Sequence, residues 1–157
     1  GTIVLVIVMF DNNLRYAREE LEMTQSELGY IFGVSDSAVR SWETAHDSIP
    51  LPKLIKFCDM YDFSLDFICG LIRKNITYGH FKTDKVKISK KLKELRKSLN
   101  LSQQKLSDDC KISQTTYSGY ETGHYLINTT NLYYICKTYN VSMDWIVGRT
   151  NNQKIGK

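Results

Sequence analysis

The sequence predicts an all-α protein that consists of two tandem five-helix domains. The first observation is a repeat: residues 23–45 return as residues 101–123, and adding 78 to any position between 14 and 70 gives its counterpart without a gap. The second is that apolar side chains recur at helical spacing in each copy. The third is that small polar residues stand where helices would begin. A repeat of this length is a whole small domain, whereas a solenoid unit is shorter and needs neighbours to bury its face.

The composition indicates a folded protein whose two halves differ in charge. Of the 157 residues, 42% are hydrophobic, which argues against disorder. Residues 1–72 contain five Lys or Arg against eleven Asp or Glu, a net charge of −6, and residues 73–157 contain sixteen against six, a net charge of +10. If the partner is a polyanion, the second half is expected to meet it. The alternative is a basic surface that is simply solvated.

The four cysteines, Cys58, Cys69, Cys110 and Cys136, do not suggest a disulfide or a metal site. They are widely spaced and form no Cys-x-x-Cys pair and no Cys/His cluster with zinc spacing. We expect reduced cysteines, with Cys58 and Cys136 at equivalent core positions. The histidines also lack the sequence context of a nucleophile or a ligand. The sequence therefore predicts no enzymatic activity, no cofactor and no metal.

An apolar N-terminal segment, residues 1–9, precedes the first predicted helix. Residues 3–10 are rich in β-branched side chains, which favours a strand, but a single strand has nothing to pair with inside a helical domain. We therefore expect a homodimer built partly through residues 3–9; the alternative is an extension of the first helix. The run is shorter than the roughly 20 apolar residues that cross a bilayer, and it lacks the features of a signal peptide. No membrane association is expected.

The first domain is predicted to span residues 10–72. Asp11 is expected to cap an amphipathic first helix. Thr24 and Glu27 have the spacing of a capping box, so a second helix is expected to begin there. Gly33 supplies the tight turn that follows this helix.

Three further helices complete the domain. Ser35 is expected to cap the third helix, which turns Trp42 inward. The Pro-Leu-Pro segment 50–52 sets the start of a fourth helix, because proline is tolerated in a first turn. Ser64 is expected to cap a short fifth helix that ends near Gly70.

The repeat predicts the same five helices in a second domain, residues 88–150. A basic linker, residues 73–87, precedes this domain, and a tail, residues 151–157, follows it. The linker interleaves basic and aromatic side chains. It can run along a phosphate backbone or be solvated, and we favour the second interpretation slightly.

Both copies resemble the helix-turn-helix domains of phage repressors and Cro proteins, the lambda-repressor-like or XRE-type family. The matching motifs are T-Q-S-E-L and S-Q-Q-K-L at the second helix, G-V-S and K-I-S at the turn, W-E-T and Y-E-T-G ending the third helix, and S-L-D-F-I-C-G and S-M-D-W-I-V-G in the fifth. The resemblance implies double-stranded DNA as the partner. It also implies that each third helix enters the major groove while the start of the second helix grips phosphates.

The resemblance assigns base contacts to the exposed side of each third helix. The candidates are Ser113, Gln114, Thr115 and Ser118 in the second domain, and Ser35, Asp36, Ser37, Arg40 and Ser41 in the first. The amide of Gln114 can pair with adenine and the guanidinium of Arg40 with guanine. Phosphate contacts are expected from residues near helix ends, namely Gln103, Lys105, Lys111, His124, Gln25 and His46.

Other shared residues are expected to be structural. Glu43 and Glu121 are predicted to bond the backbone or the arginine of the first helix in their own domain, Arg18 or Arg96. Lys111 replaces the glycine of the turn, and a lysine in the left-handed conformation costs about 1 kcal/mol.

The two copies differ in the residues that the resemblance assigns to DNA contact. The second domain has a neutral polar reading surface with a basic first helix beside it, whereas Asp36 near the tip of the first domain would repel phosphates. We therefore predict a cytoplasmic, nucleoid-associated transcriptional regulator related to phage repressors, most simply a repressor, with the second domain as the main reader. The alternative is a protein-binding module on the same fold, an antitoxin or a phage-encoded inhibitor of a defence enzyme, whose acidic first domain binds a protein partner.

Overall fold

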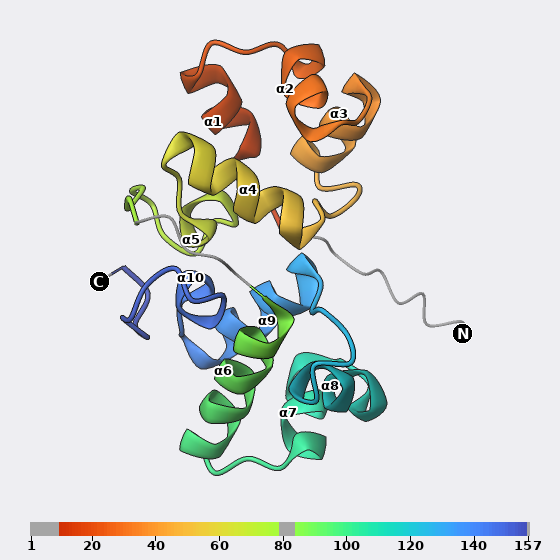
Figure 1. The fold of residues 1–157 in the computed structure, drawn as a ribbon, viewed down its shortest axis with the longest axis vertical. Helices are drawn as coiled ribbons and strands as arrows, with labels where there is room; N and C mark the ends of the chain where they lie inside the picture. The colour runs from red at the N-terminus through yellow and green to blue at the C-terminus, as the bar shows by residue number, and fades with distance from the viewer. Residues whose placement is uncertain (1–9, 79–83, 157) are drawn as a thin grey trace, which may run out of the picture.

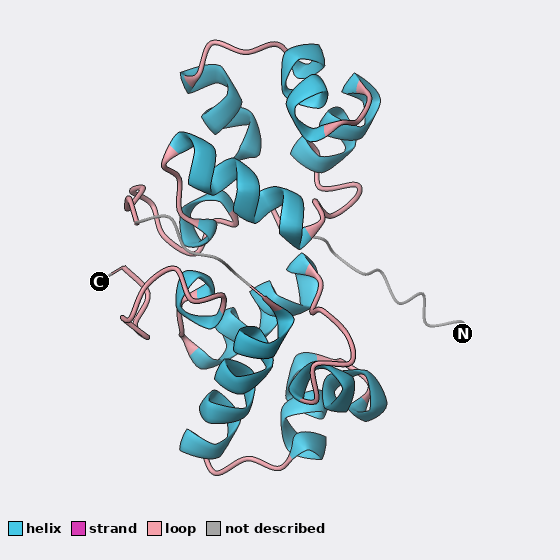
Figure 2. Cartoon of the chain, viewed as in Figure 1, coloured by secondary structure: helices cyan, strands magenta, loops and turns pink. Residues whose placement is uncertain are grey.

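The computed structural model describes residues 10–78 and 84–156, and every regular element within them is an α-helix (Figures 1 and 2). The first domain holds α1 (Leu14–Glu20), α2 (Gln25–Phe32), α3 (Asp36–Glu43), α4 (Leu51–Tyr61) and α5 (Leu65–Ile68). The second holds α6 (Lys85–Ser98), α7 (Gln103–Cys110), α8 (Gln114–Glu121), α9 (Thr129–Tyr139) and α10 (Met143–Ile146). The predicted all-α class is confirmed. Residues 3–9, predicted to form a strand and a dimer contact, lie outside the described residues.

The repeat holds at the level of single helices. A shift of 78 carries both ends of α2, α3, α4 and α5 onto those of α7, α8, α9 and α10. The first helices differ, because α6 has 14 residues and α1 has 7. The carboxylate of Asp84 accepts a hydrogen bond from the backbone N–H of Lys87 at 2.8 Å, which starts α6 early. The last three residues of the segment predicted as linker are therefore helical.

Most helices begin at the predicted caps. The side chains of Thr24, Ser35 and Ser64 each accept a hydrogen bond from the backbone N–H three residues later. The prediction for Asp11 was wrong: the N-cap of α1 is Asn13, which makes no side-chain cap bond, and the helix start is satisfied one residue earlier, by Oδ1 of Asn12. Asparagine caps as well as aspartate does, so spacing alone did not separate the three neighbouring candidates.

The tight turn between the second and third helices differs between the domains in sequence but not in shape. Gly33 has φ 71° and Lys111 has φ 57°, both in the left-handed region. At Gly29 the chain is crowded, because an added Cβ would lie 2.7 Å from the carbonyl oxygen of Val34. A small residue is therefore required there, and Ser107 at the equivalent position is fully buried.

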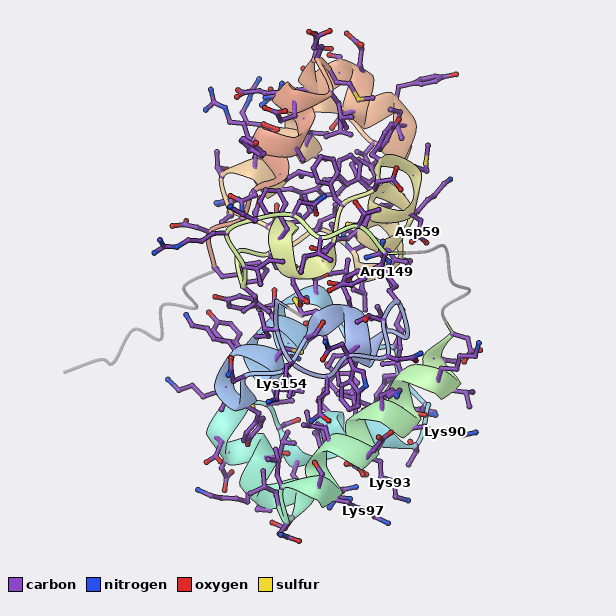
Figure 3. The ribbon with its side chains drawn as sticks, turned by 90° about the vertical axis from the view of Figure 1, so that its left-hand side faces the viewer. Asp59, Lys90, Lys93, Lys97, Arg149 and Lys154 are labelled. Atoms are coloured by element: carbon purple, nitrogen blue, oxygen red, sulfur yellow. The ribbon has the colours of Figure 1, made fainter. Side chains whose placement is uncertain are left out.

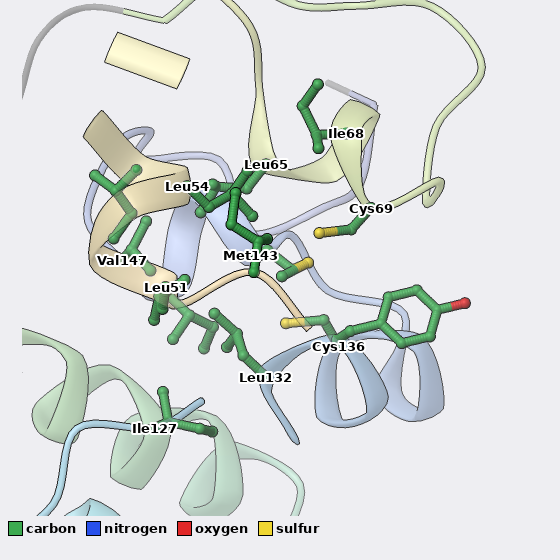
Figure 4. Packing of buried hydrophobic residues seen from close by; sticks show 14 of the residues in the cluster. Leu51, Leu54, Leu65, Ile68, Cys69, Ile127, Leu132, Cys136, Met143 and Val147 are labelled. Atoms are coloured by element: carbon green, nitrogen blue, oxygen red, sulfur yellow. The ribbon is translucent and has the colours of Figure 1, made fainter. Parts of the chain in front are cut away.

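One apolar core runs through both domains. Figure 4 shows Leu51 and Leu65 of the first domain in the same cluster as Leu132 and Met143 of the second. All four are at most 2% exposed. The two domains therefore form one packed body, in which α4 and α5 face α9 and α10 across the middle of the molecule (Figure 1).

Two buried aspartates cross this interface and cap each other's helices. The carboxylate of Asp144 accepts hydrogen bonds from the backbone N–H groups of Leu65 and Asp66, both at 2.9 Å. The carboxylate of Asp66 accepts from the backbone N–H of Met143 at 2.6 Å and from the hydroxyl of Ser142 at 2.5 Å. Each carboxylate thus satisfies free N–H groups at the start of the other domain's last helix.

Arg149 compensates part of the buried negative charge. Its side chain is 1% exposed and donates to the carboxylates of Asp144 and Asp59 and to the carbonyl oxygen of Phe63. Figure 3 labels Arg149 next to Asp59. A buried guanidinium is stable only when it is paired and hydrogen-bonded in this way. Arg149 therefore ties the end of the second domain to α4 (Asp59) and to the turn that follows it (Phe63).

The aspartate pair predicts a pH-dependent stability. Burial and the charge of Asp144 raise the pKa of Asp66 to about 8, whereas an unfolded aspartate titrates near about 3.9. The folded protein therefore keeps a proton that the unfolded chain loses, so the free energy of unfolding falls as the pH rises from about 4 to about 8. Urea denaturation at several pH values in this window measures the slope. The Asp66→Asn variant, which cannot ionise, should show a flatter profile, and an unchanged slope would contradict this assignment.

Candidate nucleic-acid interface

The third helix of the second domain, α8, presents its first turn to solvent. The hydroxyl of Ser113 accepts a hydrogen bond from the backbone N–H of Thr116 at 3.2 Å and so caps the helix. On the inner side Tyr117 is fully buried. On the outer side Gln114 and Thr115 are exposed. The structure thus places these predicted base-contacting residues together on the outer face of α8, and Ser118, farther along the helix, is half-buried.

The equivalent helix of the first domain, α3, has the same frame and different outer side chains. Val39 and Trp42 are buried, whereas Asp36, Ser37 and Arg40 are exposed. Ser35 is exposed at the cap.

Ser41 is less suited to base contact than the other predicted residues of α3. Its side chain is half-buried, and its hydroxyl donates to the carboxylate of Asp47 at 2.6 Å. The hydroxyl proton of Ser41 is thus engaged within the domain.

A buried ion pair joins α8 to α6. The guanidinium of Arg96 donates twice to the carboxylate of Glu121, at 2.5 and 3.0 Å, and once to the carbonyl oxygen of Leu101. The side chains of Arg96 and Glu121 are 14% and 3% exposed. Burial acts to raise the pKa of Glu121, but hydrogen bonds from Arg96, Gln103 and Tyr117 outweigh it and lower that pKa. The pair stays charged and locks α8 onto α6, as predicted for Glu121.

Two glutamines extend this network to the surface. Gln103, the first residue of α7, donates through Nε2 to Glu121 at 2.9 Å, and its Oε1 accepts from Nε2 of Gln114 at 3.0 Å. Gln114 is therefore held in place at the exposed tip of α8. Its amide keeps a second N–H and a carbonyl, the donor and acceptor that adenine N7 and N6 require.

The network of the first domain stops one residue earlier. The guanidinium of Arg18 donates to both oxygens of Glu43 at 2.9 Å, and Gln25 donates to Glu43 at 3.2 Å. Asp36 stands where the second domain has Gln114, and its carboxylate accepts from the backbone N–H of Ser37 instead. The two domains therefore share a frame but differ at the residue that would meet the base.

The predicted phosphate-contacting residues lie around the ends of these helices. Lys111 ends α7 in the left-handed conformation, and His124 follows α8; both are exposed. His46 is exposed at the equivalent place after α3. Lys105 is exposed but pairs with Asp109 at 2.9 Å, which offsets its charge.

The basic face of α6 does not support the reading surface in the way the sequence suggested. Lys90, Lys93 and Lys97 are exposed along α6 and lie on the side that faces the viewer in Figure 3. This is the side away from α3 and α8, which lie toward the right of Figure 1. Of the other cations of α6, Arg96 is paired with Glu121 and Lys91 lies 4.6 Å from the Trp145 ring centroid. The exposed lysines Lys90, Lys93 and Lys97 therefore lie on a different side of the molecule from α8.

Sequence reasoning missed the residues that join the domains. Asp66 and Asp144 each stand alone as an acid in an apolar helix, and a buried carboxylate requires donors. That isolation was the available signal. Arg149 is the counterpart of Leu71 in the repeat. This change from leucine to arginine between the copies was the signal in the sequence for its role.

The described part of the chain holds neither a metal site nor an exposed cysteine. No group of three or more His, Cys, Asp or Glu residues among residues 10–78 and 84–156 can hold a metal ion. All four cysteines are free and buried, and burial raises the pKa of the Cys58 and Cys136 thiols well above the ordinary value. The same part of the chain contains no helix with the length and apolar character that crossing a membrane requires.

Comparisons with known proteins agree with this geometry. Residues 14–68 and 92–146 each match a family model described as helix-turn-helix. One relative is the cryptic phage CTXphi transcriptional repressor RstR of Vibrio cholerae, 36% identical over 64 residues, which are 41% of this chain and 57% of that protein. Another is the uncharacterized HTH-type transcriptional regulator YobD of Bacillus subtilis, 32% identical over 63 residues, or 40% of this chain and 56% of that protein. The chain thus spans a little over half the length of these curated relatives.

Proposed function

Because the chain belongs to the helix-turn-helix family, we propose that it is a sequence-specific DNA-binding transcriptional regulator that acts as a repressor. It reads the major groove mainly with α8. The two family matches confirm the membership that the repeated motifs indicated. Both relatives carry the name of a transcriptional repressor or regulator, so these comparisons do not favour the protein-binding alternative. Such a regulator acts in the cytoplasm, at the nucleoid.

The observation that carries this proposal is the chain of contacts from Arg96 through Glu121 and Gln103 to Gln114. It fixes an amide at the tip of an exposed helix before any ligand arrives. Fixing the side chain in advance lowers the entropy lost on binding. The amide of Gln114 then pairs with adenine, and the methyl group of Thr115 contacts a neighbouring thymine.

Phosphates are held at the start of α7. The first N–H groups of this helix have no partner within the helix, and the positive end of the helix dipole attracts an anion there. Gln103 lies at this start, with one N–H directed at Glu121 and a second N–H left for a phosphate oxygen. Lys111 and His124 add charge or donors on either side of α8.

The test is selection from random DNA, followed by gel-shift titration with variants. Replacing both Gln103 and Gln114 with alanine should weaken binding to the selected site by about 10- to 100-fold, because a good bidentate base contact contributes about 1–3 kcal/mol. Gln104→Ala is the matched control: Gln104 is a neighbouring exposed glutamine that bonds only to Asp108, at 2.8 Å. Failure to enrich any sequence, or full retention of affinity by the double variant, would contradict the proposal.

A further inference from the structure

The contacts between the two domains are reciprocal. Asp144 accepts from the N–H of Leu65, and Asp66 accepts from the N–H of Met143. In the repeat, Asp144 is the counterpart of Asp66, and Met143 is the counterpart of Leu65. The same pair of positions therefore meets twice, once in each direction.

Reciprocal contacts define the symmetry that relates the two copies. When one position contacts a second and the counterpart of the second contacts the counterpart of the first, the copies are related by a two-fold axis. A simple translation of the second copy along the chain would produce head-to-tail contacts instead. The tandem repeat thus folds as an internal pseudo-dimer, with its axis beside Asp66 and Asp144.

The two-fold axis places both reading helices on one side of the molecule. Figure 1 shows α3 above and α8 below this axis, both toward the right of the view. A two-fold rotation also reverses the direction of one helix relative to the other. Half-sites read by two such helices run in opposite directions along the duplex, and in helix-turn-helix dimers they lie one helical turn, about 34 Å, apart.

Contacts without a symmetric counterpart fix this arrangement within one chain. The guanidinium of Arg149 donates to Asp59 of the first domain, and the hydroxyl of Thr129 donates to the carbonyl oxygen of Ile49 at 2.5 Å. The ring of Phe10 stacks on the ring of Tyr133, with the two ring centroids 3.9 Å apart. These contacts hold the two copies together within one chain.

The outer residues of the reading helices are not symmetric. Asp36 and Arg40 of α3 correspond to Gln114 and Ser118 of α8. A guanidinium favours guanine and an amide favours adenine, so the two half-sites differ in sequence. The carboxylate of Asp36 also repels the phosphate backbone, which makes the half-site under α3 the weaker one.

We propose that one chain occupies both halves of a single inverted-repeat DNA site with unequal half-sites, α8 reading the stronger half and α3 the weaker. This inference rests on the proposed function, because it names the form of the DNA that the same surface takes. The two copies follow each other in the same direction along the sequence, but the two DNA half-sites that they read run in opposite directions.

The experiment uses the intact chain and duplexes that carry the two enriched half-site sequences. The half-sites are placed as an inverted repeat, as a direct repeat, or singly, with the centre-to-centre spacing varied around about 10 base pairs. The inverted repeat should bind about a hundredfold more tightly than either other form, because the second contact becomes intramolecular. Arg40→Ala should relax base preference in one half only, and Gln114→Ala in the other half only. Lys93→Ala, on the far side of α6, is the control and should leave both preferences intact.

Two results overturn the inference while leaving the proposed function in place. Equal affinity for the direct repeat and the inverted repeat would remove the two-fold arrangement while leaving sequence-specific binding in place. Effects of Arg40→Ala and Gln114→Ala on the same half-site would show that α3 and α8 do not each read a separate half-site. If no sequence is enriched at all, the proposed function fails and the inference fails with it.

Discussion

Replacing Asp144 with alanine is expected to lower the free energy of unfolding by about 3–5 kcal/mol, because it leaves a buried guanidinium without one of its carboxylate partners. Asp144 is fully buried and accepts from Arg149 and from two backbone N–H groups of the first domain. All three donors would lose their acceptor in the variant. Equilibrium denaturation in urea, followed by far-ultraviolet circular dichroism, measures the change.

Two variants serve as controls for Asp144→Ala. Glu94→Ala removes an exposed carboxylate that lies 3.8 Å from Lys91, and it should change stability by less than about 1 kcal/mol. Asp66→Asn keeps a carbonyl oxygen for the N–H of Met143 and should be milder than Asp144→Ala. If Asp144→Ala unfolded at the same urea concentration as Glu94→Ala, the interface would not depend on this carboxylate.

Replacing Glu121 with alanine should reduce both stability and DNA affinity. The variant leaves Arg96 without its carboxylate, which costs about 3 kcal/mol, and it removes the acceptor that positions Gln103. Gln114 then loses its fixed partner at the tip of α8. The measurements are urea denaturation and gel-shift titration on the selected site.

Glu43→Ala is the matched control for this second prediction. It breaks the equivalent ion pair with Arg18, so a similar loss of stability is expected. In the first domain, however, no glutamine follows Gln25 toward the base, because Asp36 stands there. Glu43→Ala should therefore reduce DNA affinity much less than Glu121→Ala does. Equal losses of affinity from the two variants would argue against α8 as the main reader.

The helices and their caps were predictable because they depend on short-range chemistry. A hydroxyl three residues before a free N–H, as at Ser35 or Ser113, acts in the same way in any fold. The outer residues of α3 and α8, by contrast, were assigned by the resemblance to helix-turn-helix domains. The repeat then predicted the helices of the second domain, apart from the early start of α6.

The symmetry between the domains was not predictable from the repeat. A translated copy and a rotated copy have the same sequence, so the shift of 78 does not say which faces meet. That choice depends on how the apolar sides of α5 and α10 pack, with Asp66 and Asp144 between them. The direction of Lys90, Lys93 and Lys97 was missed for a similar reason: their spacing defines one face of α6, but the packing of α6 decides where that face points.

The stoichiometry of the complex tests the central claim most directly. The selected duplex is mixed with the intact chain, and the mass of the complex is measured by native mass spectrometry and by sedimentation equilibrium. The internal pseudo-dimer predicts one chain on each inverted-repeat duplex, with both half-sites protected from cleavage in a footprint. A complex with two chains on that duplex, one on each half-site, would contradict the account.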